Sequence, residues 1–220
     1  KEVILDTETT GLSVKEGHRI VEIGCIEIEN LIPTNNFFHC YLNPEREVSK
    51  SALEVHGYTD EFLANKKKFY EIADDFLKFI EGKKLVIHNA EFDISHINNE
   101  LSLIKKNNIN LNDVVDTLEL ARNKFPGSST SLDALCKRFR IDNSKREKHT
   151  ALIDCELLSK VYINLIGQKE PVFQFQNEVE KNNKELIKNI DYFKKVITPT
   201  LDEIENHKNF LKKELKKNFY

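Results

Sequence analysis

Three separated segments of the sequence carry acidic residues at positions where carboxylates can do chemistry. Asp6 and Glu8 lie two residues apart at the end of an apolar run, so an extended backbone points both side chains toward one face. Asp93 lies beside the apolar stripe of a predicted helix. Asp154 precedes Leu158 by four residues, which places it on the inward stripe of another predicted helix. A buried carboxylate needs a partner, and a bound cation would serve as one.

Each of these residues also has a structural explanation when it is considered alone. Exposed acidic turns are common at strand ends, and an acid in the first turn of a helix favours the helix dipole. Beside Asp93, however, Glu91 already meets that need. His149 stands just before the helix of Asp154 and is equally open to a structural and a catalytic role. The functional prediction therefore depends on the whole set of residues.

Together, four carboxylates and one histidine are the residue types that two-metal-ion hydrolysis of a phosphodiester bond requires. Carboxylate oxygens are natural ligands of Mg²⁺, which fills its remaining positions with water and substrate phosphate. One ion lowers the pKa of a bound water, and the other stabilises the departing oxygen. A histidine with an ordinary pKa near 6.5 is suited to take the proton of that water as general base.

The motifs around these residues resemble those of the DnaQ-like exonucleases of the DEDDh family. Three segments match in order and separation: Asp6–Gly11, His88–Asp93 and His149–Asp154. The resemblance continues through the segments between them: Val21–Gly24, Val55–Gly57 and Ser131–Cys136. It covers residues 1 to about 167. Within the family, Ile141–Arg146 is most similar to the proofreading (ε) subunits of bacterial DNA polymerase III.

This resemblance implies a ribonuclease H-like exonuclease fold and release of nucleoside 5′-monophosphates from the 3′ ends of DNA. It implies two divalent metal ions, Mg²⁺ or Mn²⁺. Carried over by position, the catalytic residues are the metal ligands Asp6, Glu8, Asp93 and Asp154 and the general base His149.

The resemblance also implies a set of substrate contacts in which Asp6, Glu8 and Asp154 take part. His56 is expected to contact the terminal nucleotide, and Thr9 and Phe92 to line its pocket. Ser51 stands five residues before His56, where these subunits usually carry an acidic residue near the substrate.

Hydrophobic periodicity and turn signals predict the strands and helices that carry these residues. Strands are predicted at 2–6, 19–29, 37–42 and 85–87. Helices are predicted at 70–81, 91–105, 117–124, 132–139 and 150–166. Strands followed by alternating strands and helices predict an α/β domain with a mixed central sheet flanked by helices.

The composition changes around Gly167 to one rich in Lys, Glu, Asn and Gln. We therefore expect an exonuclease domain at 1–167 and a linker with a polymerase-binding segment at 168–220. Residues 201–215 recover helical spacing and form a helical extension that either rests on the domain or docks on another protein. The resemblance implies that this tail binds the polymerase (α) subunit. Gln168–Phe173 is the nearest match to a sliding-clamp motif, but Pro171 replaces an aliphatic residue, which leaves clamp binding open.

Bulk properties limit the remaining possibilities. The 220 residues include 40% hydrophobic ones, enough for one sizeable domain. A formal net charge of −3 excludes a general nucleic-acid coat protein, so the basic runs Lys66–Lys68 and Lys145–Lys148 are either local phosphate contacts or solvated loops. No apolar run is long enough to cross a membrane, no export signal is recognisable, and the four dispersed cysteines suit a reducing compartment, so a cytoplasmic location is expected.

Two other functions compete with DNA proofreading. A DEDDh exonuclease acting on RNA, similar to ribonuclease T or oligoribonuclease, would have the same motifs, but the long C-terminal tail argues against it. A binding module without catalysis would have lost some of the catalytic residues, and all five are present. A DNA exonuclease with a single-strand site would favour mismatched ends, because an unpaired 3′ terminus frays more cheaply.

Overall fold

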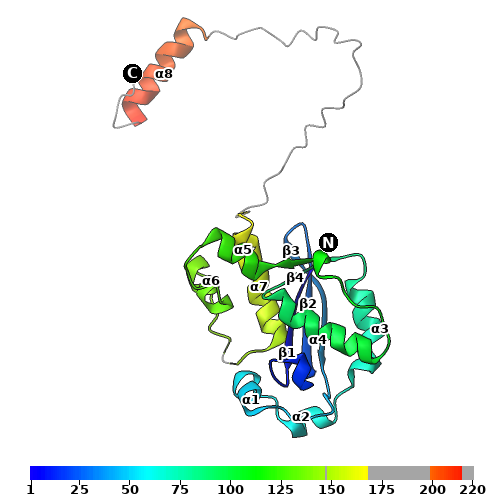
Figure 1. Cartoon of the computed structure of the whole chain (residues 1–220). Coiled ribbons are helices and arrows are strands. Elements are labelled where there is room, and N and C mark those ends of the chain that lie inside the picture. The colour runs from blue at the N-terminus through cyan, green and yellow to red at the C-terminus, as the bar shows by residue number, and fades with distance from the viewer. Residues whose placement is uncertain (147, 168–198, 215–220) are drawn as a thin grey trace, which may run out of the picture. The chain divides into compact units, whose positions relative to one another are not determined.

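The computed structural model describes residues 1–146, 148–167 and 199–214, and its contacts divide the chain into two units, Lys1–Phe173 and Gln174–Tyr220. In the first unit, a five-stranded sheet lies between two layers of helices (Figure 1). The strand order is β3-β2-β1-β4-β5. The strands are β1 (Glu2–Thr9), β2 (Ile20–Glu29), β3 (Ile32–Tyr41), β4 (Lys84–Ile87) and β5 (Val114–Asp116). The first three strands are antiparallel, whereas β4 and β5 run parallel to β1, which confirms the predicted mixed sheet.

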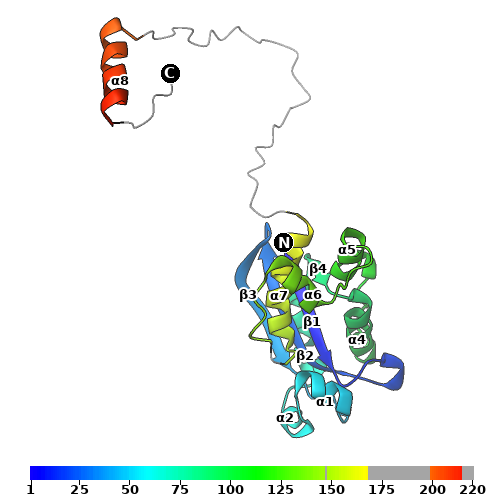
Figure 2. The ribbon, with the colours of Figure 1, turned by 90° about the vertical axis from the view of Figure 1, so that its left-hand side faces the viewer.

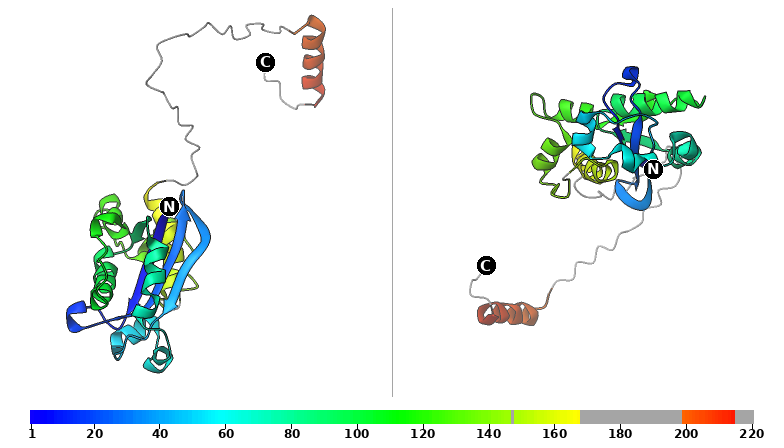
Figure 3. Two further views of the ribbon diagram at one scale, coloured as in Figure 1. Left: turned by 90° about the vertical axis from the view of Figure 1, so that its right-hand side faces the viewer. Right: turned by 90° about the horizontal axis from the view of Figure 1, so that it is seen from below.

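Helices cover both faces of this sheet. In chain order they are α1 (Lys50–His56), α2 (Asp60–Ala64), α3 (Phe69–Ile80), α4 (Ala90–Leu103), α5 (Thr117–Lys124), α6 (Leu132–Phe139) and α7 (Ala151–Leu165). Short 3₁₀ turns lie at Val14–Glu16 and Leu111–Asp113. Figure 2 views the sheet from the side of α7, and the left panel of Figure 3 views it from the side of α3.

Alternation along β1 assigns its side chains to two hydrophobic cores. Val3 and Leu5 are buried in the core on the side of α3 and α4. Ile4 is buried in the opposite core, which α5, α6 and α7 complete. Asp6 and Glu8 continue the row of Ile4 and therefore point toward the side of α7. All four cysteines are free, and three of them are buried in these cores.

Helices α1 and α2, strand β5, the end of β1 and the start of β3, which begins at Ile32 and not at residue 37, were not predicted. Helix α1 presents Leu53 and Val55 to the surface, so it lacks the inward apolar stripe that reveals a longer helix. It begins with a side-chain cap from Ser49, and α2 begins in the same way with Thr59. Strand β5 has only three residues. Strand β1 continues beyond the predicted Asp6 as far as Thr9, because β2 still pairs with it there.

The second unit contains one described helix, α8 (Leu201–Glu214), which agrees with the helical spacing predicted from residue 201. Thr200 and Glu203 form a reciprocal cap at its start, with the Thr200 N–H donating to Glu203 Oε2 at 2.8 Å. Leu201, Ile204 and Phe210 are exposed. Across the ranges that the structure describes, no helix combines the length and apolar character that a membrane crossing demands.

Candidate active site

Strand β1 carries Asp6 and Glu8, and Asp93 bonds to the edge of β1 beyond its pairing with β4. The parallel pairing of β1 with β4 covers only Glu2–Ile4. Beyond it, the Thr7 N–H and hydroxyl both donate to Oδ1 of Asp93, at 2.9 and 2.7 Å. Asp93 therefore replaces the missing strand partner, and these bonds fix its carboxylate against β1.

The turn from β4 into α4 sets the position of Asp93. Asn89 adopts a left-handed conformation, with φ of 70°, immediately before α4 begins. The Asp116 carboxylate at the end of β5 accepts the N–H groups of Asn89 at 3.0 Å and Ala90 at 3.2 Å. The same carboxylate caps α5 through the Leu118 N–H at 2.8 Å. One residue of β5 thus orients the starts of two helices.

Helix α7 supplies the fourth carboxylate, and buried groups of β2 position its first turn. Glu22 is fully buried and accepts the Ala151 N–H at 2.9 Å. Gly24 lies against Ala151 so closely that no Cβ atom would fit. Thr150 caps the helix through the Ile153 N–H. Asp154, one turn into α7, is consequently buried and faces β1.

These elements bring all five predicted catalytic residues into one pocket of about 190 Å³. Glu8, His149 and Asp154 each offer a ligand atom, and these three atoms lie within 4.8 Å of one another. The lining consists of Asp6, Thr7, Glu8, His88, Phe92, Asp93, Leu132, Arg146, His149, Asp154 and Leu158. The pocket lies at the carboxyl end of β4, where open α/β sheets commonly bind ligands.

Three of the four carboxylates are held in an unfavourable electrostatic environment. Burial, followed by the charges of Asp154, Glu22 and Asp93, raises the pKa of Glu8 to about 8. Burial raises the pKa of Asp93 to about 7, although the bonds from Thr7 oppose the change. The pKa of Asp6 is raised well above its ordinary value by burial and by neighbouring carboxylates. Cations bound to these hard oxygen donors would relieve the repulsion, so the residues fit divalent metal ions.

Asp154 differs from the other three because it has a cationic partner. Arg146 Nε and Nη2 donate to its two oxygens, each at 2.6 Å. Burial alone would raise the pKa of Asp154, but the hydrogen bonds and the charge of Arg146 hold that pKa below its ordinary value. Arg146 Nη2 also donates to His149 Nδ1 at 2.8 Å. Because a guanidinium can only donate, Nδ1 must accept, and the proton of the neutral imidazole is on Nε2.

Arg146 is the residue of this site that sequence reasoning missed. It belongs to the basic run at 145–148, for which either phosphate contacts or solvated loops were expected. Its side chain is instead only 7% exposed and turned toward Asp154. Lys148 is also engaged within the protein, with Nζ donating to the Glu54 carbonyl at 2.6 Å. The available signal was the position of Arg146 just ahead of His149 in the sequence.

A second pocket of about 350 Å³ adjoins the first, because Glu8 and Phe92 line both. Its lining consists of Glu8, Thr9, Gly11, Leu12, Ser51, Ala52, Val55, His56 and Phe92. The four predicted substrate contacts outside the acidic cluster, Thr9, Ser51, His56 and Phe92, therefore gather here. Most of the remaining lining is apolar.

Both ring nitrogens of His56 are used inside the protein. Nδ1 accepts the Tyr58 N–H at 3.0 Å, so Nε2 carries the proton that it donates to the Thr9 carbonyl at 3.3 Å. The ring also stacks on Tyr58 at 4.8 Å between centroids. Burial lowers the pKa of His56, which keeps it neutral. These contacts join the end of α1 to β1 and form one wall of the second pocket.

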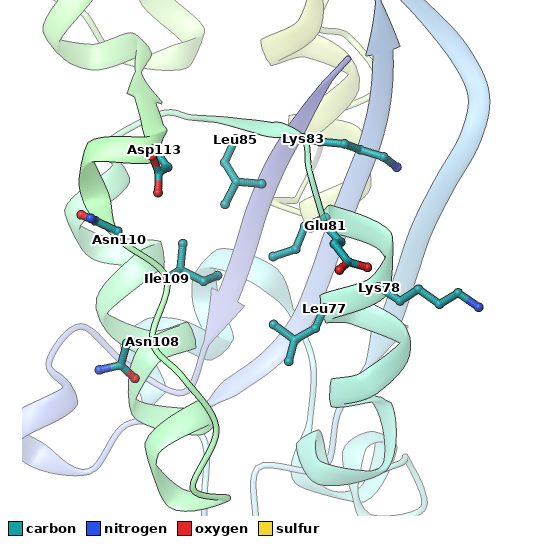
Figure 4. Close-up of a pocket in the computed structure, with 10 residues that line it drawn as sticks. Leu77, Lys78, Glu81, Lys83, Leu85, Asn108, Ile109, Asn110 and Asp113 are labelled. Atoms are coloured by element: carbon teal, nitrogen blue, oxygen red, sulfur yellow. The ribbon is translucent and has the colours of Figure 1, made fainter.

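A larger pocket of about 510 Å³ lies elsewhere, between the end of α3, the start of β4 and the segment before β5 (Figure 4). It is lined by Leu77, Lys78, Ile80, Glu81, Lys83, Leu85, Asn108, Ile109, Asn110 and Asp113. None of the predicted site residues belongs to it. The predicted site residues therefore do not gather in this larger pocket.

Comparisons with known proteins show what this chain is similar to in sequence and fold. Residues 3–162 match the exonuclease (RNase_T) family. The chain is 48% identical to the DNA polymerase III subunit epsilon of Rickettsia typhi, across 97% of this chain and 96% of that protein. Among solved structures it is similar to exonuclease X in complex with 5′-overhanging duplex DNA, with a TM-score of 0.59, 25% identity and coverage of 77% of this chain and 93% of the other. The nuclease domain of 3′hExo, a DEDDh family member bound to rAMP, shares the fold, with a TM-score of 0.65, 17% identity and coverage of 76% and 92%.

Proposed function

The chain belongs to the DnaQ-like exonuclease family and is a 3′→5′ exonuclease, and we propose that the pocket of four carboxylates and His149 is its active site. Similarity to epsilon subunits over nearly the whole chain makes this a proofreading activity. The observation that carries the proposal is the convergence of four carboxylates from β1, α4 and α7 on one small pocket. Three of them have raised pKa values that cations would reverse.

The residues of this pocket have distinct roles in the proposed reaction. Asp6, Glu8, Asp93 and Asp154 would hold two divalent ions, Mg²⁺ or Mn²⁺. Bound there, such ions would supply an activated water and neutralise charge on the leaving 3′ oxygen. His149, in the lining of this pocket, accepts the proton of the attacking water as general base at Nδ1, the nitrogen whose lone pair accepts the Arg146 bond in this structure.

The second pocket is proposed to hold the terminal nucleotide. Its shared wall at Glu8 and Phe92 supports this role, because the phosphate of a nucleotide bound there would lie near the carboxylates. Phe92 offers an aromatic surface for stacking, which tolerates any base. Thr9, Ser51 and His56 complete the wall, and His56 acts by positioning it, because its ring nitrogens already bond to Thr9 and Tyr58. A site for a single unpaired nucleotide supports selection of frayed, mismatched ends.

The C-terminal segment is proposed to join this nuclease to the DNA polymerase III α subunit. Helix α8 presents Leu201, Ile204 and Phe210 as exposed apolar residues, which supports docking on a partner. A tether raises the effective concentration of the nuclease at the primer end. The candidate clamp motif, Gln168–Phe173, lies outside the described residues, and clamp binding through it stays a prediction.

Digestion of oligonucleotides labelled at the 5′ end tests the proposal. With Mg²⁺ or Mn²⁺, single-stranded DNA should give a ladder that shortens from the 3′ end, and EDTA should abolish it. The same reaction on RNA distinguishes the alternatives, because preferential digestion of RNA would support an RNA exonuclease. Intact DNA and RNA together would support a binding module. The variant Asp6→Ala/Glu8→Ala serves as the control for contaminating nucleases.

A further inference from the structure

Asp154 is the only one of the four pocket carboxylates that bonds to a cationic side chain among the described residues. Its two oxygens each accept a bond of 2.6 Å from the Arg146 guanidinium. Charge-assisted bonds in this forked geometry are strong and directional. The Asp154 oxygens are therefore already bonded to the positive charge of Arg146. A metal ion that approaches Asp154 must replace these bonds and is also repelled by the guanidinium.

Arg146 also bonds to a second carboxylate, that of Asp133. Nη1 donates to Oδ2 of Asp133, in the first turn of α6, at 2.8 Å. The Asp133 side chain is 56% exposed, while Arg146 is 7% exposed. Asn143 Nδ2 donates to the other Asp133 oxygen at 2.9 Å and holds that carboxylate in place. The guanidinium thus bridges a deep carboxylate and a rim carboxylate.

We propose that Arg146 is a resident counter-cation that competes with the divalent ion for Asp154 and is retained by Asp133 when the ion binds. This inference rests on the proposed role of Asp154 as a metal ligand. The two positive charges repel each other, so occupation of the site by one weakens the hold of the other. Competition of this kind is reciprocal: the ion loosens Arg146 from Asp154 as much as Arg146 weakens the ion.

The same exchange affects the proposed general base. Arg146 Nη2 bonds at once to Asp154 Oδ2 and to His149 Nδ1. When the guanidinium withdraws toward Asp133, both the ligand oxygen and the imidazole lone pair are released. Arg146 is therefore a positioning residue that stabilises the metal-free site and couples the availability of the base to metal binding.

Calorimetric titration of the full chain with Mn²⁺ tests the competition without any measurement of hydrolysis. Arg146→Gln removes the competing charge and should bind Mn²⁺ roughly tenfold more tightly, within the usual range of site–site coupling. Asp133→Asn removes the retaining partner, so Arg146 stays on Asp154 and Mn²⁺ should bind several-fold more weakly, on the order of fivefold. In the double variant, Asp133→Asn should have no further effect, because no guanidinium remains to be retained.

The Arg19–Glu100 pair provides a matched control. Arg19 Nε and Nη2 donate to the two Glu100 oxygens at 2.6 and 2.7 Å, in the same forked geometry but away from the pocket. Arg19→Gln should lower the melting temperature equally with EDTA and with Mn²⁺, and leave the Mn²⁺ affinity unchanged. Arg146→Gln should lower the melting temperature far more with EDTA than with Mn²⁺. In this variant Asp154 is buried without a cationic partner only when the metal is absent.

Two results separate failure of this inference from failure of the proposed function. If Arg146→Gln binds Mn²⁺ more weakly than the unaltered chain, or equally well, the competition is wrong and Arg146 prepares Asp154 for the ion. If the unaltered chain and Asp154→Asn bind Mn²⁺ equally, Asp154 is not a ligand and the proposed metal site fails with the inference. Asp133→Asn changes a largely exposed side chain, so it tests the competition even if Arg146→Gln does not fold.

Discussion

Gly24 of β2 and Ala151 of α7 approach so closely that a Cβ atom added at Gly24 would lie 2.6 Å from the Ala151 carbonyl carbon. The other near atoms, the Ala151 oxygen and the Leu152 nitrogen at 2.8 Å, also belong to the backbone. A backbone cannot move aside as a flexible side chain can. The absence of a side chain at Gly24 therefore sets how near α7, with Asp154 in its first turn, lies to β1.

Gly24→Ala should accordingly damage both stability and catalysis. Forcing a methyl group between β2 and α7 is expected to cost about 1 to 3 kcal/mol of unfolding free energy. The start of α7 must move away, so hydrolysis should fall more than the loss of folded protein explains. Urea unfolding and single-turnover hydrolysis of single-stranded DNA measure the two effects. Asn36→Ala, at an exposed position of β3, serves as the control, and equal rates for both variants would contradict the close approach.

Asp6→Ala/Glu8→Ala should give a folded protein with almost no nuclease activity. Both carboxylates have raised pKa values, so the metal-free fold gains nothing from their charge, and their removal should not lower its stability. Circular dichroism and thermal unfolding with EDTA check the fold, and release of nucleotides with Mg²⁺ checks the activity. Near-normal hydrolysis by this variant would show that the acidic pocket is not the catalytic centre.

His149→Ala should retain metal binding but cleave slowly. The loss of a general base typically lowers the rate by about 10² to 10⁴-fold. Mn²⁺ titration and single-turnover hydrolysis separate binding from chemistry. His207→Ala in α8, at an exposed position, is the control and should leave hydrolysis of free oligonucleotides unchanged. A decrease of less than about threefold for His149→Ala would be too small for a general base.

The metal-free protein should become less stable as the pH rises from about 4.5 to about 8. The pKa of Glu8 is raised from its ordinary 4.5 to about 8, so between these values the unfolded chain has lost a proton that the folded chain keeps. Folding therefore takes up a proton in this range, and the free energy of unfolding falls as the pH rises. Melting temperatures with EDTA should show this fall, and Glu8→Gln should reduce it. An identical pH dependence for the unaltered chain and Glu8→Gln would contradict the raised pKa.

Truncation after Gly167 should leave the hydrolysis of free single-stranded oligonucleotides nearly intact. All five predicted catalytic residues precede that position, whereas α8 lies in the second unit. The truncated chain should no longer co-purify with the polymerase α subunit. In the full chain, Phe210→Asp/Leu211→Asp should weaken this association without changing hydrolysis. Loss of oligonucleotide hydrolysis on truncation, or undiminished binding to the polymerase in a calorimetric titration, would refute this division of labour.

Local sequence patterns were enough to identify the residues proposed to do the chemistry and most of the strands and helices that carry them. An apolar run ending in Asp6 and Glu8, and an inward-facing Asp154, are local patterns, because strand and helix periodicity depends on near neighbours. The mixed sheet and the spans of α5 and α6 followed from the same periodicities, and the structure confirms them. The short helix α1 left no such pattern because it presents Leu53 and Val55 to the surface, and β5 left none because three residues are too few to show a period.

Which distant groups share a pocket depends on how the strands and helices pack. The strand order places β1 beside β4, so Asp93 can bond to Thr7, and the glycine at position 24 lets α7 bring Asp154 to Glu8. In the folded chain Arg146 also points inward and bonds to Asp154, although its basic neighbours in the sequence suggested a surface role. Burial and charge depend on everything that packs around a residue, including segments far away in the chain. For that reason the raised pKa of Glu8 and the ion pair of Asp154 could not be derived from sequence spacing.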